Sequence, residues 1–146
     1  MAAKRSRSKR RSGTSALPDL PLFLDRALDS EHIYSALTAA GATVLRHRDH
    51  FADNAMDSDW LPFVGHRGWA VLTKDEAMQH NGIEKTAITN ARVRVFILVR
   101  GNLSGSEMAS IFVRALPSMA RIIQNQEPPF IARVYRDGTA SKTKLV

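Results

Sequence analysis

The chain contains no cysteine. Disulfide bonds and thiolate zinc sites are therefore excluded, and any bound metal must use oxygen or imidazole ligands, which favours hard cations. The sequence also lacks an apolar run close to the roughly 18 residues needed to cross a bilayer. Its first residues are basic and polar, without the hydrophobic stretch of a secretory signal. We therefore expect a cytoplasmic protein that has no membrane segment.

The positive charge of the chain is concentrated at one end. The 146 residues carry a formal charge of +7, but six of the 21 Lys and Arg residues lie between Lys4 and Arg11. Without these six, 15 basic residues face 14 acidic ones, so the remainder carries a formal charge of only +1. The high net charge is thus a property of the N-terminal segment and says little about a site in the folded part.

Composition predicts one folded unit between two tails. Residues 1–16 show no apolar periodicity and carry charges that repel one another, so we expect a disordered basic tail. This tail fits either a solubilising arm or an arm that binds RNA or a partner. Residues 17–137 are expected to form a single domain around one core. After the Asp137-Gly138 turn, residues 138–146 are expected to be flexible.

Short β-type runs alternate with stretches of helical spacing, which is typical of crossover connections on a parallel sheet. A turn is expected at Asn81-Gly82. Ser104 and Glu107 form an S-x-x-E capping box, and the helix that follows is expected to kink at Pro117. Five strands are expected, at residues 22–24, 44–45, 69–73, 93–99 and 130–135, with about four helices between them. The pattern therefore predicts an α/β fold with a parallel sheet.

Acidic residues follow two of the predicted strands. Asp25 comes directly after the first strand, and Asp75 follows the third after one intervening residue. Asp57 and Asp59 lie at the start of the helix before that third strand, in the segment AMDSDWL. Ligands of open parallel sheets bind beyond the carboxyl ends of the strands. We therefore expect these acids to face one rim of the sheet and to act as candidate metal ligands.

Such a cluster predicts metal chemistry. Two carboxylates within about 4 Å repel by roughly 4 kcal/mol at an effective dielectric of about 20, so they persist together only with protons or a cation. Mg²⁺ takes one or two carboxylates and keeps several waters, which suits attack of an activated water on a phosphodiester. Arg26, Lys74 and Arg100 are candidates to hold the non-bridging phosphate oxygens.

Several of these signals have a structural alternative. Asp57 also fits an ordinary helix N-cap, and a solvated Asp after a strand is common in turns. His47 and His50 are interpreted as ordinary surface histidines of a loop rather than as a metal pair. Trp60 and Trp69 are interpreted as core residues rather than as stacking platforms for bases.

Four segments carry a resemblance to a known family. They are LPLFLDRALDSEHIYSALTAAGATVL, AMDSDWLPFVGHRGWAVLTKD, ARVRVFILVRGNLSGSEMASIFVRALP and PPFIARV. In order and spacing they resemble the PIN-like family of VapC-type toxins, from about Leu20 to Val134. The most specific pieces are FLDR, D-x-D-W-L, LTKD and GNLSGSEM.

The resemblance implies a three-layer α/β/α sandwich with a central, mainly parallel, five-stranded sheet. It also implies a metal-dependent endoribonuclease that uses Mg²⁺ or Mn²⁺ on an RNA substrate. Asp25 matches the acid after the first strand, Asp57 the acid that opens the second helix, and Asp75 the acid of the T-x-D motif. Thr73 is then expected to hold one of the metal ligands in place or to contact the phosphate. Family members commonly are toxins held inactive by an antitoxin protein, and they often form homodimers.

The sequence departs from the larger PIN domains at their fourth acid. Glu76, Asn102 and Glu107 are the available candidates, and Glu107 is already used by the capping box. Asn102 is preferred, as a ligand or substrate contact. With only three converging carboxylates, a second metal would bind weakly or not at all.

Two other functions remain open. A receiver-like phospho-acceptor domain also has acids at strand ends, but it needs an acidic pair at the first strand and a Lys after the last, whereas Arg26 follows Asp25 and Tyr135-Arg136 ends the fifth strand. A non-catalytic RNA-binding module would combine the basic tail with a PIN-like scaffold. Such a module would lose RNA on deletion of residues 1–15 and would be unaffected by Asp75→Asn.

Overall fold

The computed structural model of the protein describes residues 17–99 and 102–143. The predicted basic tail, residues 1–16, and the predicted phosphate contact Arg100 lie outside the described residues. The strands are β1 (Leu22–Leu24), β2 (Val44–Arg46), β3 (Ala70–Thr73), β4 (Arg94–Leu98), β5 (Phe130–Val134) and β6 (Ala140–Thr143). The helices are α1 (Glu31–Ala39), α2 (Asp57–Arg67), α3 (Ala77–His80), α4 (Gly82–Ala91) and α5 (Gly105–Asn125), with 3-10 turns η1 (Arg26–Leu28) and η2 (His47–Asp49).

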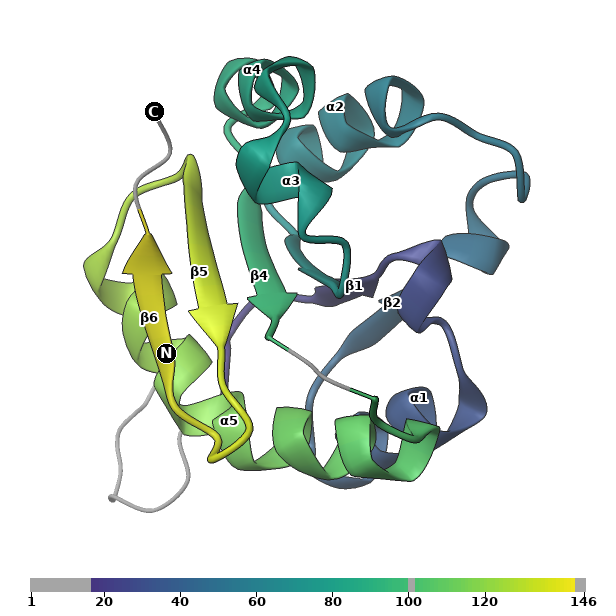
Figure 1. The fold of residues 1–146 in the computed structure, drawn as a ribbon, viewed down its shortest axis with the longest axis vertical. Coiled ribbons are helices and arrows are strands. Elements are labelled where there is room, and N and C mark those ends of the chain that lie inside the picture. Colours follow the sequence, from purple (N-terminus) through teal and green to yellow (C-terminus); the bar gives the residue numbers. More distant parts are fainter. Residues whose placement is uncertain (1–16, 100–101, 144–146) are drawn as a thin grey trace, which may run out of the picture.

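The strands form one sheet in the order β2-β1-β3-β4-β5-β6, and every pairing except that of β5 with β6 is parallel. Helices α1 and α5 lie together on one side of this sheet, and α2, α3 and α4 lie on the other (Figure 1). The predicted α/β/α sandwich with a mainly parallel sheet is thereby confirmed.

The predicted number of strands is wrong, because a sixth strand follows the turn at Asp137. The Asp137 carboxylate accepts hydrogen bonds from the backbone N–H and the hydroxyl of Thr139, at 3.0 and 2.7 Å. Gly138 adopts a left-handed φ of 88°, which a glycine tolerates. The chain therefore reverses and pairs antiparallel with β5, where a flexible tail was expected. An edge strand is half solvated, so its polar sequence ASKT gives no apolar pattern that would predict it.

Both faces of the sheet are buried, which explains the uninterrupted hydrophobic runs of its central strands. In β1, Leu22 and Leu24 pack with α1 and α5, whereas Phe23 points to the opposite side and packs with α2. The two resulting cores hold the sheet rigidly between the helices. The carboxyl ends of β1 and β3 thus provide a fixed base for the side chains that follow them.

Helix α5 begins as the sequence predicts. The Ser104 hydroxyl accepts a hydrogen bond from the Glu107 N–H at 3.1 Å, and the Glu107 carboxylate accepts one from the Ser104 N–H at 2.8 Å. Pro117 lies within the helix but does not divide it, since the helix runs from Gly105 to Asn125. Among the described residues, no helix is both long enough and apolar enough to span a membrane.

Candidate metal centre

The candidate site lies where the order of the strands changes direction. From β1 the chain moves outward to β2 and then returns past β1 to form β3, so β1 and β3 are neighbours whose connections leave in opposite directions. This switch point is where open parallel sheets bind ligands. Asp25 follows β1 and its N–H donates to the Leu72 carbonyl of β3 at 3.1 Å, while Asp75 follows the end of β3. Both acids therefore lie on the same rim.

Thr73 connects these two acids. Its hydroxyl donates a hydrogen bond to Asp25 Oδ2 at 2.7 Å and accepts one from the Asp75 N–H at 3.0 Å. The side chain is fully buried. In this position Thr73 fixes the carboxylate of Asp25 and the backbone of Asp75, and it is not exposed to a phosphate.

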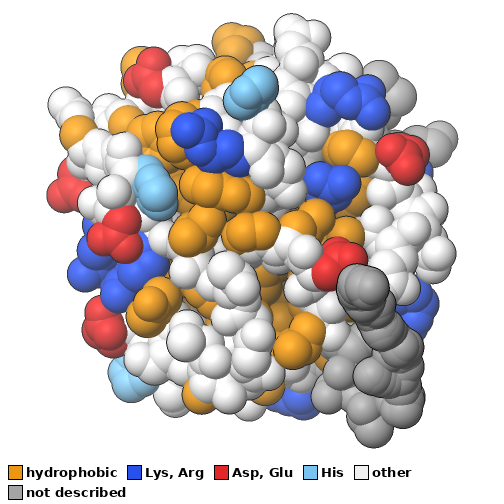
Figure 2. All heavy atoms as spheres, turned by 180° about the vertical axis from the view of Figure 1, so that it is seen from behind, with side chains coloured by type: hydrophobic (Ala, Val, Ile, Leu, Met, Phe, Trp, Pro, Cys, Tyr) orange, Lys and Arg blue, Asp and Glu red, His pale blue; other side chains and the backbone are white. Residues whose placement is uncertain are grey.

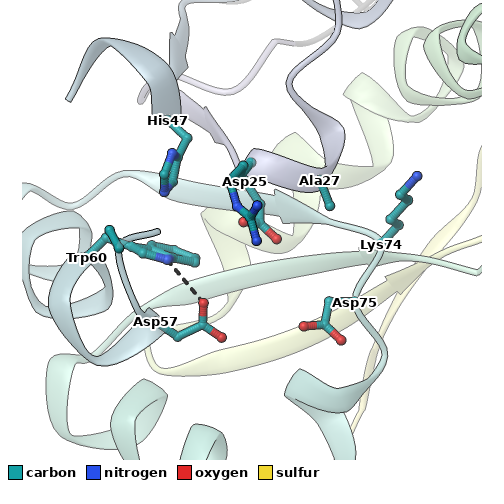
Figure 3. A pocket seen from close by; sticks show the side chains of 9 residues that line it. Asp25, Ala27, His47, Asp57, Trp60, Lys74 and Asp75 are labelled. Carbon is teal, nitrogen blue, oxygen red and sulfur yellow. Dashed lines mark hydrogen bonds between the residues drawn. The ribbon is translucent and has the colours of Figure 1, made fainter. Parts of the chain in front are cut away.

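Asp57 reaches the same rim from the start of α2. It is the first residue of the helix, and the N-cap is Met56, so Asp57 does not have the N-cap position considered as its structural alternative. Its Oδ1 accepts a hydrogen bond from Trp60 Nε1 at 3.1 Å (Figure 3). Trp60 is buried in the core as expected, with 1% of its surface exposed, but its polar edge orients an acid of the site.

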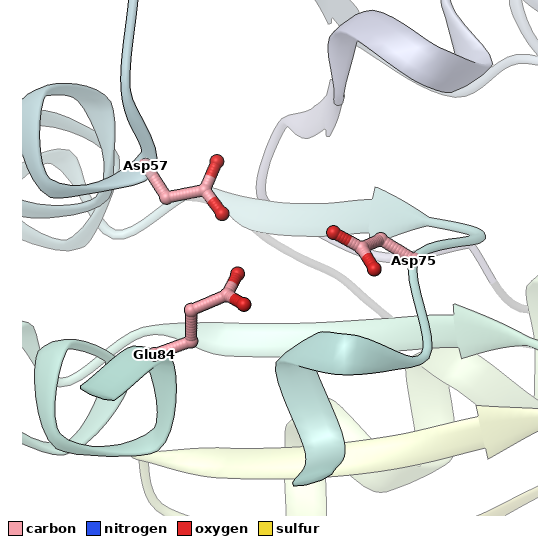
Figure 4. A group of neighbouring side chains, drawn as sticks. All are labelled: Asp57, Asp75 and Glu84. Atoms are coloured by element: carbon pink, nitrogen blue, oxygen red, sulfur yellow. The ribbon is translucent and has the colours of Figure 1, made fainter. Parts of the chain in front are cut away.

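Glu84 is the residue that the sequence analysis missed. It lies in the first turn of α4, after an N-cap at Asn81 whose side chain accepts hydrogen bonds from the N–H groups of Ile83 and Glu84, at 2.8 and 3.2 Å. One ligand oxygen each of Asp57, Asp75 and Glu84 lies within 4.8 Å of the other two, and the three carboxylates point toward one another (Figure 4). An Asn followed three residues later by an acid is a helix-start pattern that could have indicated Glu84.

A close contact between α2 and α4 brings Asp57 and Glu84 together. At Gly65 the helices approach so closely that an added Cβ would lie 2.1 Å from the Ala91 carbonyl oxygen. The two helices contact each other, and each carries its acid of the cluster in its first turn. The partial positive charge of helix N-termini favours carboxylates there.

The cluster carries more negative charge than the protein alone neutralises. The pKa of Glu84 is raised to about 8, first by a hydrogen bond with Asp57, then by burial and by the charges of Asp57, Asp75 and Asp25. Burial and the charge of Asp57 also raise the pKa of Asp25, although the Thr73 hydroxyl opposes this. Glu84 Oε2 is buried and has no hydrogen-bond partner among the described residues.

These features fit a divalent cation. An ion with bonds of about 2.1 Å holds opposite oxygens about 4.2 Å apart, so small side-chain shifts would bring the three carboxylates into its shell. The cation would satisfy the orphaned oxygen of Glu84 and offset the repulsion that raises its pKa. The donor set contains only oxygens, which suits Mg²⁺ or Mn²⁺.

A cavity of about 280 Å³ opens beside the cluster. Asp25, Asp57 and Asp75 line it together with the two predicted phosphate contacts Arg26 and Lys74 (Figure 3). Arg26 is exposed and Lys74 is partly buried. The cavity is thus lined by three carboxylates and by two basic side chains, which suits a phosphodiester together with a metal ion.

His47 also lines this cavity, and its interpretation as a surface histidine is wrong. The turn η2 follows β2 directly and carries the ring inward, where it packs against Phe23, Phe51 and Trp60 and keeps only 1% of its surface exposed. Its Nδ1 has no hydrogen-bond partner among the described residues. His50, in contrast, is exposed as expected.

The other candidate residues lie outside the cluster. Asp59 accepts a hydrogen bond from the N-cap backbone of its own helix at 3.1 Å. Asn102 is exposed and does not line the cavity. Glu76 forms an ion pair with Arg133 at 3.3 Å, and Glu107 serves its capping box. On the reverse of the molecule, hydrophobic side chains occupy the centre of the visible face and the visible acids are scattered (Figure 2).

Comparison with known proteins gives the family. The model of the PIN like domain matches residues 21–100. A protein of Mycobacterium tuberculosis, "Putative ribonuclease VapC45", is 25% identical over 118 residues, which cover 78% of this chain and 85% of that protein. No solved structure gives a significant match. These findings confirm the predicted resemblance, and the chain belongs to the family of PIN-like domains.

Proposed function

We propose that the protein is an endoribonuclease that depends on Mg²⁺ or Mn²⁺. The observation that carries this proposal is the convergence of Asp25, Asp57, Asp75 and Glu84, from four separate segments, at the switch point of the sheet. The family and the name of the mycobacterial relative support RNA as the substrate. Membership of this family argues against a receiver-like phospho-acceptor.

Asp57, Asp75 and Glu84 would hold the ion, and the nearby Asp25 would add negative charge to the site. A bound ion would supply an activated water molecule and would offset the charge that develops on the phosphate. Arg26 and Lys74, which line the same cavity, would bind the non-bridging oxygens. Thr73 and Trp60 keep Asp25 and Asp57 in position, because each donates a hydrogen bond to one carboxylate oxygen.

The VapC-type resemblance further supports a role as the toxin of a toxin–antitoxin pair. An antitoxin protein would then occlude the cavity in the resting cell. Induced expression of the chain alone should arrest growth, and Asp75→Asn should abolish this effect. A homodimer, also expected from the family, is tested by light scattering of the purified protein.

The proposal is tested by incubation of the purified protein with a mixed RNA pool and Mg²⁺ or Mn²⁺. We expect cleavage that EDTA abolishes and that Asp75→Asn and Glu84→Gln reduce at least 100-fold, a loss of roughly 3 kcal/mol of transition-state stabilisation. Asp59→Asn is the matched control, since it removes an acid of the same helix that accepts a hydrogen bond from the Met56 N–H and is not one of the three clustered carboxylates. Equal cleavage by all variants would identify a contaminating nuclease and refute the assignment.

The same experiment separates a nuclease from a binding module. A binding module would retain RNA in a filter assay after Asp75→Asn, would lose it on deletion of residues 1–15, and would show no metal-dependent product. A nuclease would lose product on substitution of the acids and keep cleavage when the tail is removed.

A further inference from the structure

Two large hydrophobic side chains are left in solvent next to the acidic cluster. Ile83 is 82% exposed and Met56 is 67% exposed, the highest values among the large hydrophobic side chains of the described residues. They come from different elements, Met56 from the N-cap of α2 and Ile83 from the first turn of α4. Exposed apolar groups that lie together usually mark a binding surface.

These side chains border a groove of about 340 Å³. Ala55 and Ala87 complete its apolar lining, and we call the four residues Ala55, Met56, Ile83 and Ala87 the apolar shelf. Asp57 and Glu84 line the same groove, and both belong to the candidate metal centre. The shelf is therefore continuous with the place where a phosphate would be held.

The size of the shelf limits what it can bind. A stable protein interface buries about 800 Å² on each partner and uses 20 or more residues, roughly. Two exposed large side chains and two alanines are far too few for a folded partner or a second copy of this chain. They match a single flat ring, which a Met thioether and a branched Ile can contact over its face.

We infer that the apolar shelf holds the nucleobase next to the scissile phosphate of a single-stranded RNA. This inference rests on the proposed function, because it requires a phosphodiester at the metal centre. Proteins that bind single-stranded RNA generally stack bases on aromatic side chains or Arg planes beside a site for the backbone, and the exposed Met56 and Ile83 side chains would take that place here. Since the four side chains of the shelf are apolar, they contact the face of the base and favour the larger purines over pyrimidines. Ser58 also lines the groove and is its uncharged polar residue.

The test is a double substitution combined with removal of the base. Cleavage sites are first mapped for the wild-type protein on single-stranded RNA, and oligonucleotides are then made in which the base on either side of the cleaved bond is replaced by an abasic residue. We expect loss of one of these two bases to lower kcat/KM about 10-fold in the wild type. Met56→Ser/Ile83→Ser should lower kcat/KM about 10-fold on intact RNA and lose less than about 2-fold more on the abasic RNA.

Mn²⁺ binding by the double variant and a control substitution distinguish loss of the base contact from damage to the metal centre. The double variant should bind Mn²⁺ like the wild type in calorimetry, because serine suits both helix-start positions and neither residue supplies a ligand. Leu17→Ser is the control for loss of an exposed apolar side chain, since Leu17 is 37% exposed and lies outside the shelf. It should cleave both RNAs like the wild type.

The results that would refute base binding by the apolar shelf differ from those that would refute the proposed nuclease function. If the double variant cleaves intact RNA like the wild type, or loses as much as the wild type on abasic RNA, the shelf holds no base. If it changes only the oligomeric state in light scattering, the shelf is a contact between copies. If the wild type shows no metal-dependent cleavage of any RNA, the proposed function itself fails.

Discussion

Replacement of Glu84 by Gln tests two effects of the acidic cluster separately: its destabilisation of the metal-free protein and its contribution to metal binding. The pKa of Glu84 is about 8 in the folded protein and 4.5 in its ordinary state, mainly because of its hydrogen bond with Asp57 and its burial. Between pH 4.5 and about 8, the folded protein therefore keeps a proton on Glu84 that the unfolded chain has already released. Consequently the free energy of unfolding of the metal-free protein falls as the pH rises from 4.5 to about 8, and it stays low above that.

The size of this loss follows from the same values. A difference from 4.5 to about 8 corresponds to at most about 5 kcal/mol. Glu84 is partly exposed, so water and counterions screen much of this, and we expect about 1–2 kcal/mol. In EDTA at about pH 9, Glu84→Gln should therefore raise Tm by about 5 °C, and at about pH 4 the two proteins should unfold together.

With saturating Mn²⁺, the wild type should instead have a higher Tm than Glu84→Gln. The wild type then gains the free energy of binding with its full set of carboxylates, and the variant gains about 1.4 kcal/mol less for each tenfold loss of affinity. The assay is thermal unfolding by calorimetry across this pH range, with EDTA and with Mn²⁺. Glu127→Gln is the control, because it removes an exposed acid of the α5–β5 connection. Parallel pH profiles of wild type and Glu84→Gln in EDTA would refute the reasoning.

Three further predictions concern the same site. As the pH is raised towards about 8, the Mn²⁺ affinity should increase by up to about tenfold per pH unit, because binding displaces the proton of Glu84, and above this pH it should level off. A pH-independent affinity in calorimetry would contradict this. Thr73→Val should lower Mn²⁺ affinity or kcat/KM about 10-fold, since Asp25 loses its 2.7 Å hydrogen bond, and Thr73→Ser should restore most of it. Trp60→Phe should weaken Mn²⁺ binding by about 10-fold with the fold retained in circular dichroism, because Asp57 loses the indole N–H; unchanged binding would show that the hydrogen bond does not orient the ligand.

The part of the site that belongs to the sheet could be predicted from the sequence. Asp25 and Asp75 follow strands with clear hydrophobic runs, and parallel strands bring their carboxyl ends to one rim whatever the exact register. Asp57 was found because it opens a helix just before such a strand. The structure brings all three around one cavity. The ligand roles of Asp57 and Asp75, and the electrostatic role of Asp25 beside them, remain proposals.

Glu84 could not be placed in the same way, because its position depends on packing between two helices. Asn81-Gly82 suits a turn and a helix N-cap equally well, since Asn favours both, and only the second choice puts Glu84 at a helix start. The distance from Glu84 to Asp57 is then set by the approach of α2 to α4. A local sequence pattern contains no information about that approach.

The burial of the polar residue His47 also could not be predicted from the sequence. His47 lies in a polar segment, and nothing in its neighbours distinguishes an inward ring from a solvated one. The direction is fixed by Arg46, whose guanidinium group is held by Asp29 and Glu31 at 2.6 Å each, so that the chain leaves β2 at a defined angle. These partners lie 15 and 17 positions away in the sequence, beyond the range of a local pattern.

The missing side chain at position 65 has a consequence for ion selectivity. Gly65 and Ala91 touch near one end of the α2–α4 pair, and the acids lie near the other, about 12 Å along α2 at 1.5 Å per residue. Because helices are stiff, one methyl group inserted at this contact would change the spacing between the distant carboxylates. A wider spacing suits Ca²⁺, with its longer bonds to oxygen, better than Mg²⁺. In the proposed metal centre, the choice between the two ions would thus depend partly on backbone atoms that neither ion touches.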